Sequence, residues 1–143
     1  MQNAPEICSV HYHQQEAPQI LAASLADHLL SLDGHHQYVL LCIGTDRSTG
    51  DALGPLVGTH LQNYKPQGLS VYGSLDHPVH ALNLAETVET IVQNHTRPYI
   101  IAVDACLGHT RQVGHILLRP GSLKPGAGVH KNLPEVGDLS FTG

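Results

Sequence analysis

Charged residues are scarce in this sequence, and positive charge is the scarcest. Asp, Glu, Lys and Arg make up 13% of the 143 residues, and the seven Lys and Arg side chains form no basic run. A chain with so little positive charge offers few contacts to a phosphate backbone. We therefore expect no nucleic-acid partner.

Cysteines and long apolar runs are also few. Three cysteines without a Cys-x-x-Cys spacing do not make a disulfide framework, which favours a reducing, cytoplasmic compartment. No run approaches the roughly 18 apolar residues that a membrane helix needs, and no signal-peptide pattern opens the chain. We therefore expect no membrane partner.

Histidine, by contrast, is frequent. Twelve histidines are scattered along the chain, and their full protonation would add twelve positive charges to a net charge of −5. We interpret most of them as surface residues without a particular role. Because net charge governs solubility and self-association, we expect both to depend on pH. A homo-oligomer is one of the partner states that the sequence allows.

The chain is long enough for one domain with its own core. Residues 1–16 are polar and predict an irregular N-terminal arm, and residues 17–143 predict a single α/β domain. Gly, Pro and Lys dominate from Gly121 onward, and no further element is predicted there. Strands that alternate with helices favour a mostly parallel sheet with helices on both faces. Apolar periodicity predicts helices over 17–32, 52–64 and 79–95, and strands over 38–43, 69–72, 99–103 and 113–118.

Two aspartates follow predicted buried strands. Asp51 stands after the turn 44–50 at the start of a helix, and Asp104 comes directly after the strand 99–103. Ligands of parallel sheets bind beyond the carboxyl ends of the strands, so we expect both carboxyls near one site if the two strands are neighbours. A close pair shares a proton because two full negative charges repel. Such a pair polarises an amide carbonyl and deprotonates water, whereas two carboxylates with an imidazole make a divalent-metal site.

Each aspartate also has a structural interpretation, which the spacing alone slightly favours. Asp51 suits a helix N-cap, and Asp104 suits a turn that caps the next segment. Asp46 and Arg47 are interpreted as a turn and a solvated ion pair, with a substrate-facing Arg47 as the alternative.

One long motif carries a family resemblance. The string Cys42-Ile-Gly-Thr-Asp-Arg-Ser-Thr-Gly-Asp-Ala-Leu-Gly-Pro-Leu-Val-Gly58 closely resembles the signature of the YyaC family of sporulation proteins, described as spore proteases of endospore-forming bacteria. The segments 103–108, 118–121 and 126–138 match as well. The resemblance spans roughly residues 36 to 143.

That family is similar to the germination protease and, more distantly, to the hydrogenase maturation peptidases. The resemblance implies their three-layer αβα fold, of the phosphorylase/hydrolase type. The germination protease has a Thr-Pro-Asp-Ala-Leu-Gly-Pro segment, which 49–55 matches with Gly50 in place of the first proline. Its two catalytic aspartates match Asp51 and Asp104. Members of the YyaC family continue with another strand and a long helix, so the resemblance implies a domain that lacks these elements.

The leading hypothesis is an endopeptidase without a cofactor that cleaves a protein or peptide in the cytoplasm of a sporulating cell or forespore. Asp51 and Asp104 would activate water, with Arg47, Asp46 and His130 as accessory or substrate-binding residues. Because the maturation peptidases bind a metal through two carboxylates and a later histidine, the first alternative is a divalent-metal site of Asp51, Asp104 and His130. The second alternative is a non-catalytic sporulation factor that binds a peptide or partner.

Overall fold

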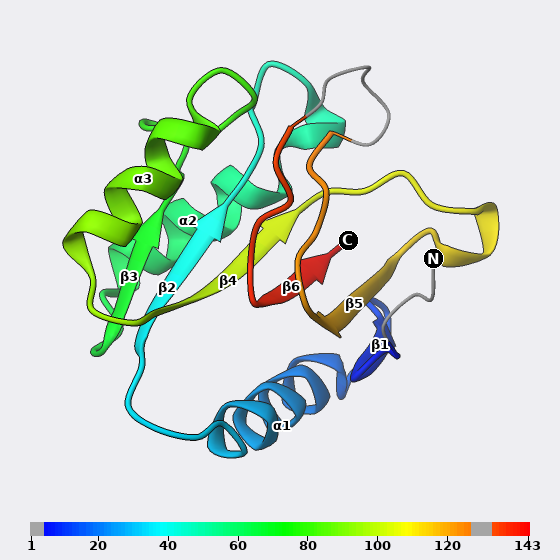
Figure 1. Ribbon diagram of the computed structural model, residues 1–143. Coiled ribbons are helices and arrows are strands. Elements are labelled where there is room, and N and C mark those ends of the chain that lie inside the picture. Colours follow the sequence, from blue (N-terminus) through cyan, green and yellow to red (C-terminus); the bar gives the residue numbers. More distant parts are fainter. Residues whose placement is uncertain (1–4, 127–132) are drawn as a thin grey trace.

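The computed structural model describes residues 5–126 and 133–143, which form a mixed α/β structure (Figure 1). One six-stranded sheet has the order β1-β5-β6-β4-β2-β3. Strands β2, β3, β4 and β6 run parallel, whereas β5 is antiparallel to both of its neighbours. The prediction of a mostly parallel sheet with intervening helices is confirmed. The strands are β1 Cys8–His11, β2 Gln37–Cys42, β3 Leu69–Tyr72, β4 Pro98–Asp104, β5 His115–Pro120 and β6 Leu139–Thr142, and the helices are α1 Ala17–Leu30, α2 Leu53–Tyr64 and α3 Leu84–Asn94.

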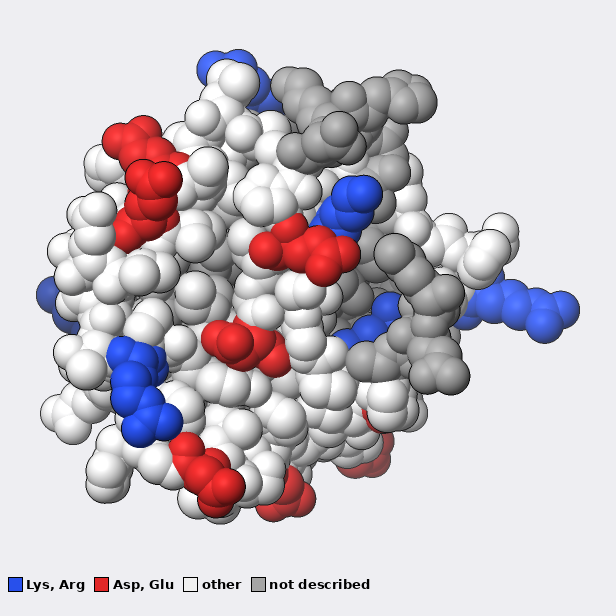
Figure 2. Space-filling view, in the orientation of Figure 1, with Lys and Arg blue, Asp and Glu red and all other residues white. Residues whose placement is uncertain are grey.

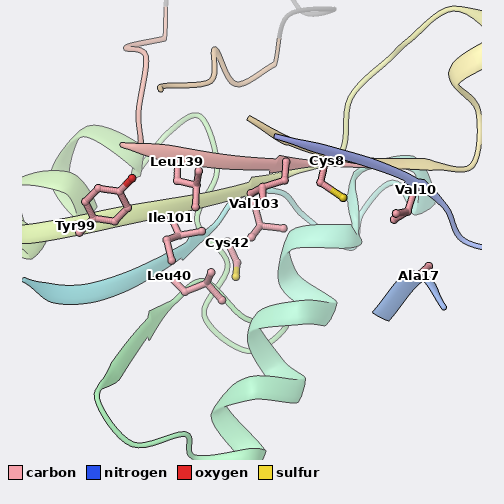
Figure 3. Close-up of a cluster of buried hydrophobic side chains, with 10 residues drawn as sticks. Cys8, Val10, Ala17, Leu40, Cys42, Tyr99, Ile101, Val103 and Leu139 are labelled. Carbon is pink, nitrogen blue, oxygen red and sulfur yellow. The ribbon is translucent and has the colours of Figure 1, made fainter. Parts of the chain in front are cut away.

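The helices cover both faces of the sheet. Apolar side chains of α1 and α2 pack with Leu40, Cys42 and Val103 in one buried cluster. Figure 3 shows this cluster, in which side chains of β2, β4 and β6 point to the side where α2 lies. Apolar side chains of α3 pack with the alternate residues of the same strands, including Leu41 and Ala102, on the other face. The continuous apolar runs of β2 and β4 thus reflect burial on both faces.

The first turn of α2 lies unusually close to the end of β2. A Cβ on Gly54 would overlap the carbonyl oxygen of Ile43, so only glycine permits this approach. The close packing fixes where the loop from Gly44 to Asp51 begins and ends.

Helix α3 begins later than the sequence pattern predicts. Val79 forms a bridge with Ile43, which extends the pairing beyond β2 and β3, so the chain is still extended there. Asn83, the residue before the helix, donates from its side-chain amide to the Pro78 carbonyl oxygen at 3.0 Å. These contacts delay the first helical residue to Leu84.

Two strands depart from the sequence prediction. The irregular arm predicted over residues 1–16 is wrong at Cys8–His11, which forms β1 and pairs antiparallel with β5. Cys8 and Val10 of this short strand alternate with polar residues and are buried, which accounts for its pairing. Strand β6 was not predicted, and it lies between β4 and β5 in the centre of the sheet.

Candidate functional site

Asp51 is positioned by a tight loop that follows β2. Gly44 has φ +141°, and a Cβ there would overlap the Asp51 carbonyl oxygen. The backbone N–H of Thr45 donates to that same carbonyl oxygen at 3.0 Å, which closes the loop. A 3₁₀ turn, Thr49–Asp51, then leads into α2, so Asp51 stands just before the helix.

Asp104 is the last residue of β4, and only 6% of its surface is exposed. Strand β4 lies directly between β2 and β6, and Val103 is in register with Cys42 at the end of β2. The loop that carries Asp51 therefore starts on the strand next to the one that ends in Asp104.

The two carboxyls interact electrostatically. Burial, and after it the negative charge of Asp51, raises the pKa of Asp104 from 3.8 to about 7. Burial also raises the pKa of Asp51, while a backbone hydrogen bond from Thr45 acts in the opposite direction. Burial thus makes ionisation of each carboxyl less favourable than in water, and the effect of the Asp51 charge on Asp104 means that the two carboxyls are close enough to interact.

The structural interpretations of the two aspartates fare differently. Asp51 does not cap α2, because the N-cap position is Ala52 and no side-chain hydrogen bond caps this helix. Asp104 does accept backbone hydrogen bonds, from Ala105 and Gly126, and these lower the pKa of its carboxyl. They act more weakly than burial and the Asp51 charge, so the net shift remains upward.

Two of the three predicted accessory residues, Asp46 and Arg47, lie in the described structure. Asp46 and Arg47 are exposed in the loop after β2, where the backbone N–H of Arg47 donates to the Thr45 hydroxyl at 3.2 Å. The predicted turn is thus present, but among the described residues no ion pair joins Asp46 and Arg47. His130, the third predicted metal ligand, lies outside the described residues. Within 5–126 and 133–143, no three His, Cys, Asp or Glu side chains are grouped to hold a metal ion.

Thr142 is a neighbour of the pair that the sequence did not reveal. It is the last residue of β6 and is in register with Asp104 on the adjacent parallel strand. The alternation Leu139-Ser-Phe-Thr142 was the available signal, since it has the period of a strand.

One pocket of the described structure lies on the side of the sheet that α1 and α2 cover, and neither Asp51 nor Asp104 lines it. It is an apolar groove of about 570 Å³ between α1 and α2, bounded by residues such as Leu25, Val57 and Phe141. Leu53 and Val103 also border the groove, and these two residues lie close to Asp51 and Asp104 along the chain.

On the one face that Figure 2 shows, the described basic side chains do not form a patch. On the face shown in Figure 2, Lys and Arg lie apart from one another, and acidic groups are interspersed among them. Among the residues that the structure describes, no helix combines the length and apolarity needed to cross a membrane.

Taken together, the fold and the site define a mixed α/β protein with a coupled carboxyl pair at the carboxyl edge of its sheet. A family model described as "Protein of unknown function (DUF1256)" matches residues 9–143, and the chain belongs to this family. It is also 54% identical over 105 residues to the "Uncharacterized protein YyaC" of Bacillus subtilis (strain 168). That match covers 73% of this chain and 51% of the relative, so the chain spans about half the length of the curated relative. The predicted membership of the YyaC family is confirmed.

Proposed function

We propose that this protein is a peptidase in which Asp51 and Asp104 share a proton and activate water. The observation that supports this most directly is the buried carboxyl of Asp104, whose pKa of about 7 arises from burial and from Asp51. Perturbed carboxyls at the carboxyl end of a parallel strand are typical of catalytic sites. The resemblance of 49–55 to the catalytic segment of the germination protease selects the same aspartate.

The proposed reaction assigns a different role to each carboxyl. Asp104, with the higher pKa, is the protonated member and donates its proton to the carbonyl oxygen of the scissile amide. Asp51 is the ionised member and takes a proton from water, whose oxygen forms a bond to the carbonyl carbon. The C–N bond then breaks, and the proton held by Asp51 goes to the amine that leaves. The carbonyl O–H returns its proton to Asp104, so the pair ends in its starting state.

The substrate class that we propose is a protein made in sporulating cells, by analogy with the germination protease. The same analogy extends to a three-layer fold of the phosphorylase/hydrolase type and to a cytoplasmic site of action. No metal takes part in the proposed reaction.

The test compares Asp51→Asn, Asp104→Asn and the wild-type protein on protein extracts from sporulating Bacillus subtilis between pH 5 and 8. New peptide termini are identified by mass spectrometry. Asp27→Asn is the matched control, because Asp27 is an exposed aspartate on helix α1 and takes no part in the proposed reaction. We expect both pair variants to lose cleavage by at least about a hundredfold while the control retains it. Cleavage that survives in both pair variants would reject the proposed dyad.

A second candidate function is peptide binding without turnover. It is favoured by the backbone hydrogen bonds from Ala105 and Gly126 to Asp104, which give this carboxyl a structural role. Binding of a sporulation protein without new termini at any pH from 5 to 8 would support this candidate over the peptidase.

A further inference from the structure

A buried hydroxyl beside Asp104 has no partner in the described structure. The Oγ1 atom of Thr142 is inaccessible to solvent, and it forms no hydrogen bond with any described residue. Most buried polar side-chain atoms of folded proteins have a protein or water partner, so this atom calls for one. A hydroxyl both donates and accepts, and water satisfies both functions.

The register of the sheet places this hydroxyl on the same side as the Asp104 carboxyl. Asp104 and Thr142 are paired residues of the parallel strands β4 and β6, which lie about 4.8 Å apart in such a sheet. Paired residues of parallel strands project to the same face. That face also carries Ala102, which belongs to the cluster packed under α3. The Asp104 carboxyl and the Thr142 hydroxyl therefore share one region of the structure.

The end of β6 is held firmly against the end of β4. The backbone N–H of Cys106 donates to the Gly143 carbonyl oxygen at 2.9 Å, and the N–H of Gly143 donates to the Asp104 carbonyl oxygen at 3.4 Å. Both bonds are made by Gly143, the residue after Thr142, and they hold the end of β6 beside Asp104. Although Thr142 also borders the apolar groove, its hydroxyl is buried and does not open into that groove.

Two further buried atoms without a partner lie on the same face of the neighbouring strand β5. Leu117 is in register with Thr142, and His115 and Arg119 stand two residues to either side of it. Because side chains alternate along a strand, all three share the face of Thr142. The buried Nδ1 of His115 and Nε of Arg119 have no hydrogen-bond partner among the described residues. The buried polar atoms without a partner on this face thus lie on both β5 and β6.

We propose that Thr142 is a positioning residue whose hydroxyl holds a water molecule against the Asp104 carboxyl. This inference rests on the proposed function in one respect, namely that this water is the one that attacks the substrate. The water bridges the Thr142 hydroxyl and the carboxyl pair, so that its oxygen is oriented before the substrate binds. Bridging waters of this kind are nearly as favourable in enthalpy as direct hydrogen bonds.

The first test is a crystal structure of the protein at about 1.5 Å resolution, which needs no substrate. We expect an ordered water within hydrogen-bond distance of Thr142 Oγ1 and of an Asp104 carboxyl oxygen, at about 2.7–3.0 Å from each. A hydroxyl that instead bonds only to protein atoms, or a dry site, overturns the inference. Both outcomes are independent of whether the protein cleaves peptides.

The second test uses three variants whose Asp104 carboxyl is titrated by ¹³C NMR. Thr142→Val keeps the shape but removes the hydroxyl, and Thr142→Ser keeps the hydroxyl. Ser140→Ala is the matched control, because Ser140 lies on the same strand and face, is buried, and donates to the Arg119 carbonyl oxygen at 3.5 Å. Loss of a hydrogen-bonded water destabilises the ionised carboxylate, so Thr142→Val should raise the titration midpoint by about half to one pH unit. Thr142→Ser and Ser140→Ala should leave it unchanged.

An unchanged midpoint in Thr142→Val, or an equal shift in Ser140→Ala, contradicts the positioning role. In the cleavage assay Thr142→Val should lower kcat about tenfold with little change in KM, and Thr142→Ser should restore it. If neither pair variant affects cleavage but the midpoint shifts as expected, the peptidase proposal fails and the role of Thr142 toward Asp104 stands.

Discussion

The charge state of Asp104 should make the folded protein less stable as the pH rises. Its pKa of about 7 in the folded state lies above its ordinary value of 3.8. Between these two values the native state binds more protons than the unfolded state, so the free energy of unfolding falls with increasing pH. This contribution is fully present below about pH 4 and is lost as the pH passes through about 7.

The size of the effect follows from the shift. A difference of about three pKa units corresponds to about 4 kcal/mol, at about 1.4 kcal/mol per unit. Asp104→Asn removes the titration, so the stability of the variant relative to the wild type should improve by about 2–4 kcal/mol between pH 4 and pH 8. Asparagine has one side-chain acceptor oxygen for the amides of Ala105 and Gly126, which adds a cost of about 1–2 kcal/mol at every pH. The raised pKa of Asp104 is therefore tested by how the difference in free energy of unfolding between Asp104→Asn and the wild type changes with pH.

The measurement is urea unfolding followed by far-ultraviolet circular dichroism at half-unit pH steps from 4 to 8.5. Asp27→Asn is the control, because it removes one negative charge at an exposed position on helix α1. The charge of Asp51 contributes to the raised pKa of Asp104, so Asp51→Asn should lower that pKa. The pH range over which the free energy of unfolding falls should therefore be shorter in Asp51→Asn than in the wild type. A difference between Asp104→Asn and the wild type that does not change with pH would refute the reasoning.

Three further outcomes follow from the structure. Gly54→Ala should lower the free energy of unfolding, measured by urea titration, by about 1–3 kcal/mol, because the added Cβ would overlap the Ile43 carbonyl oxygen. Gly50→Ala is the control and should be tolerated, because the space around Gly50 is open. In the native protein, iodoacetamide should alkylate the exposed Cys106 quickly and the buried Cys42 only on unfolding. The reason is that burial raises the pKa of Cys42 to about 12, so its thiol is not ionised. Equal alkylation rates for the two cysteines, measured by peptide mass spectrometry, would contradict this. Cleavage should persist after dialysis against EDTA, and loss of activity that zinc or manganese restores would favour the metal alternative.

Much of the fold could be predicted because its central elements are locally encoded. The runs at 38–43 and 99–103 are continuously apolar, and the structure buries them on both faces as β2 and β4. The strand at 69–72 matches β3 at both ends. The loops after β2 and β4 carry Asp51 and Asp104. Because ligands of parallel sheets bind beyond the carboxyl ends of the strands, these two residues could be predicted without knowledge of the strand order.

The missed strands depend on contacts that are distant in the sequence. Strand β6 has four residues after a Gly- and Pro-rich segment, and it is a strand because β4 and β5 pair with it on both sides. Strand β1 is stabilised by pairing with β5, more than 100 residues away along the chain. The position of Thr142 beside Asp104 follows from the β4–β6 register, which no local pattern encodes.

The most direct test of the central claim is the ¹³C titration of the Asp51 and Asp104 carboxyls in the wild-type protein and in Asp51→Asn. We expect Asp104 to titrate near pH 7 in the wild type, Asp51 above its ordinary range, and the Asp104 midpoint to fall when Asp51 is neutralised. Two independent titrations near pH 4, with no response of Asp104 to Asp51→Asn, would contradict the claim that the two carboxyls share a proton.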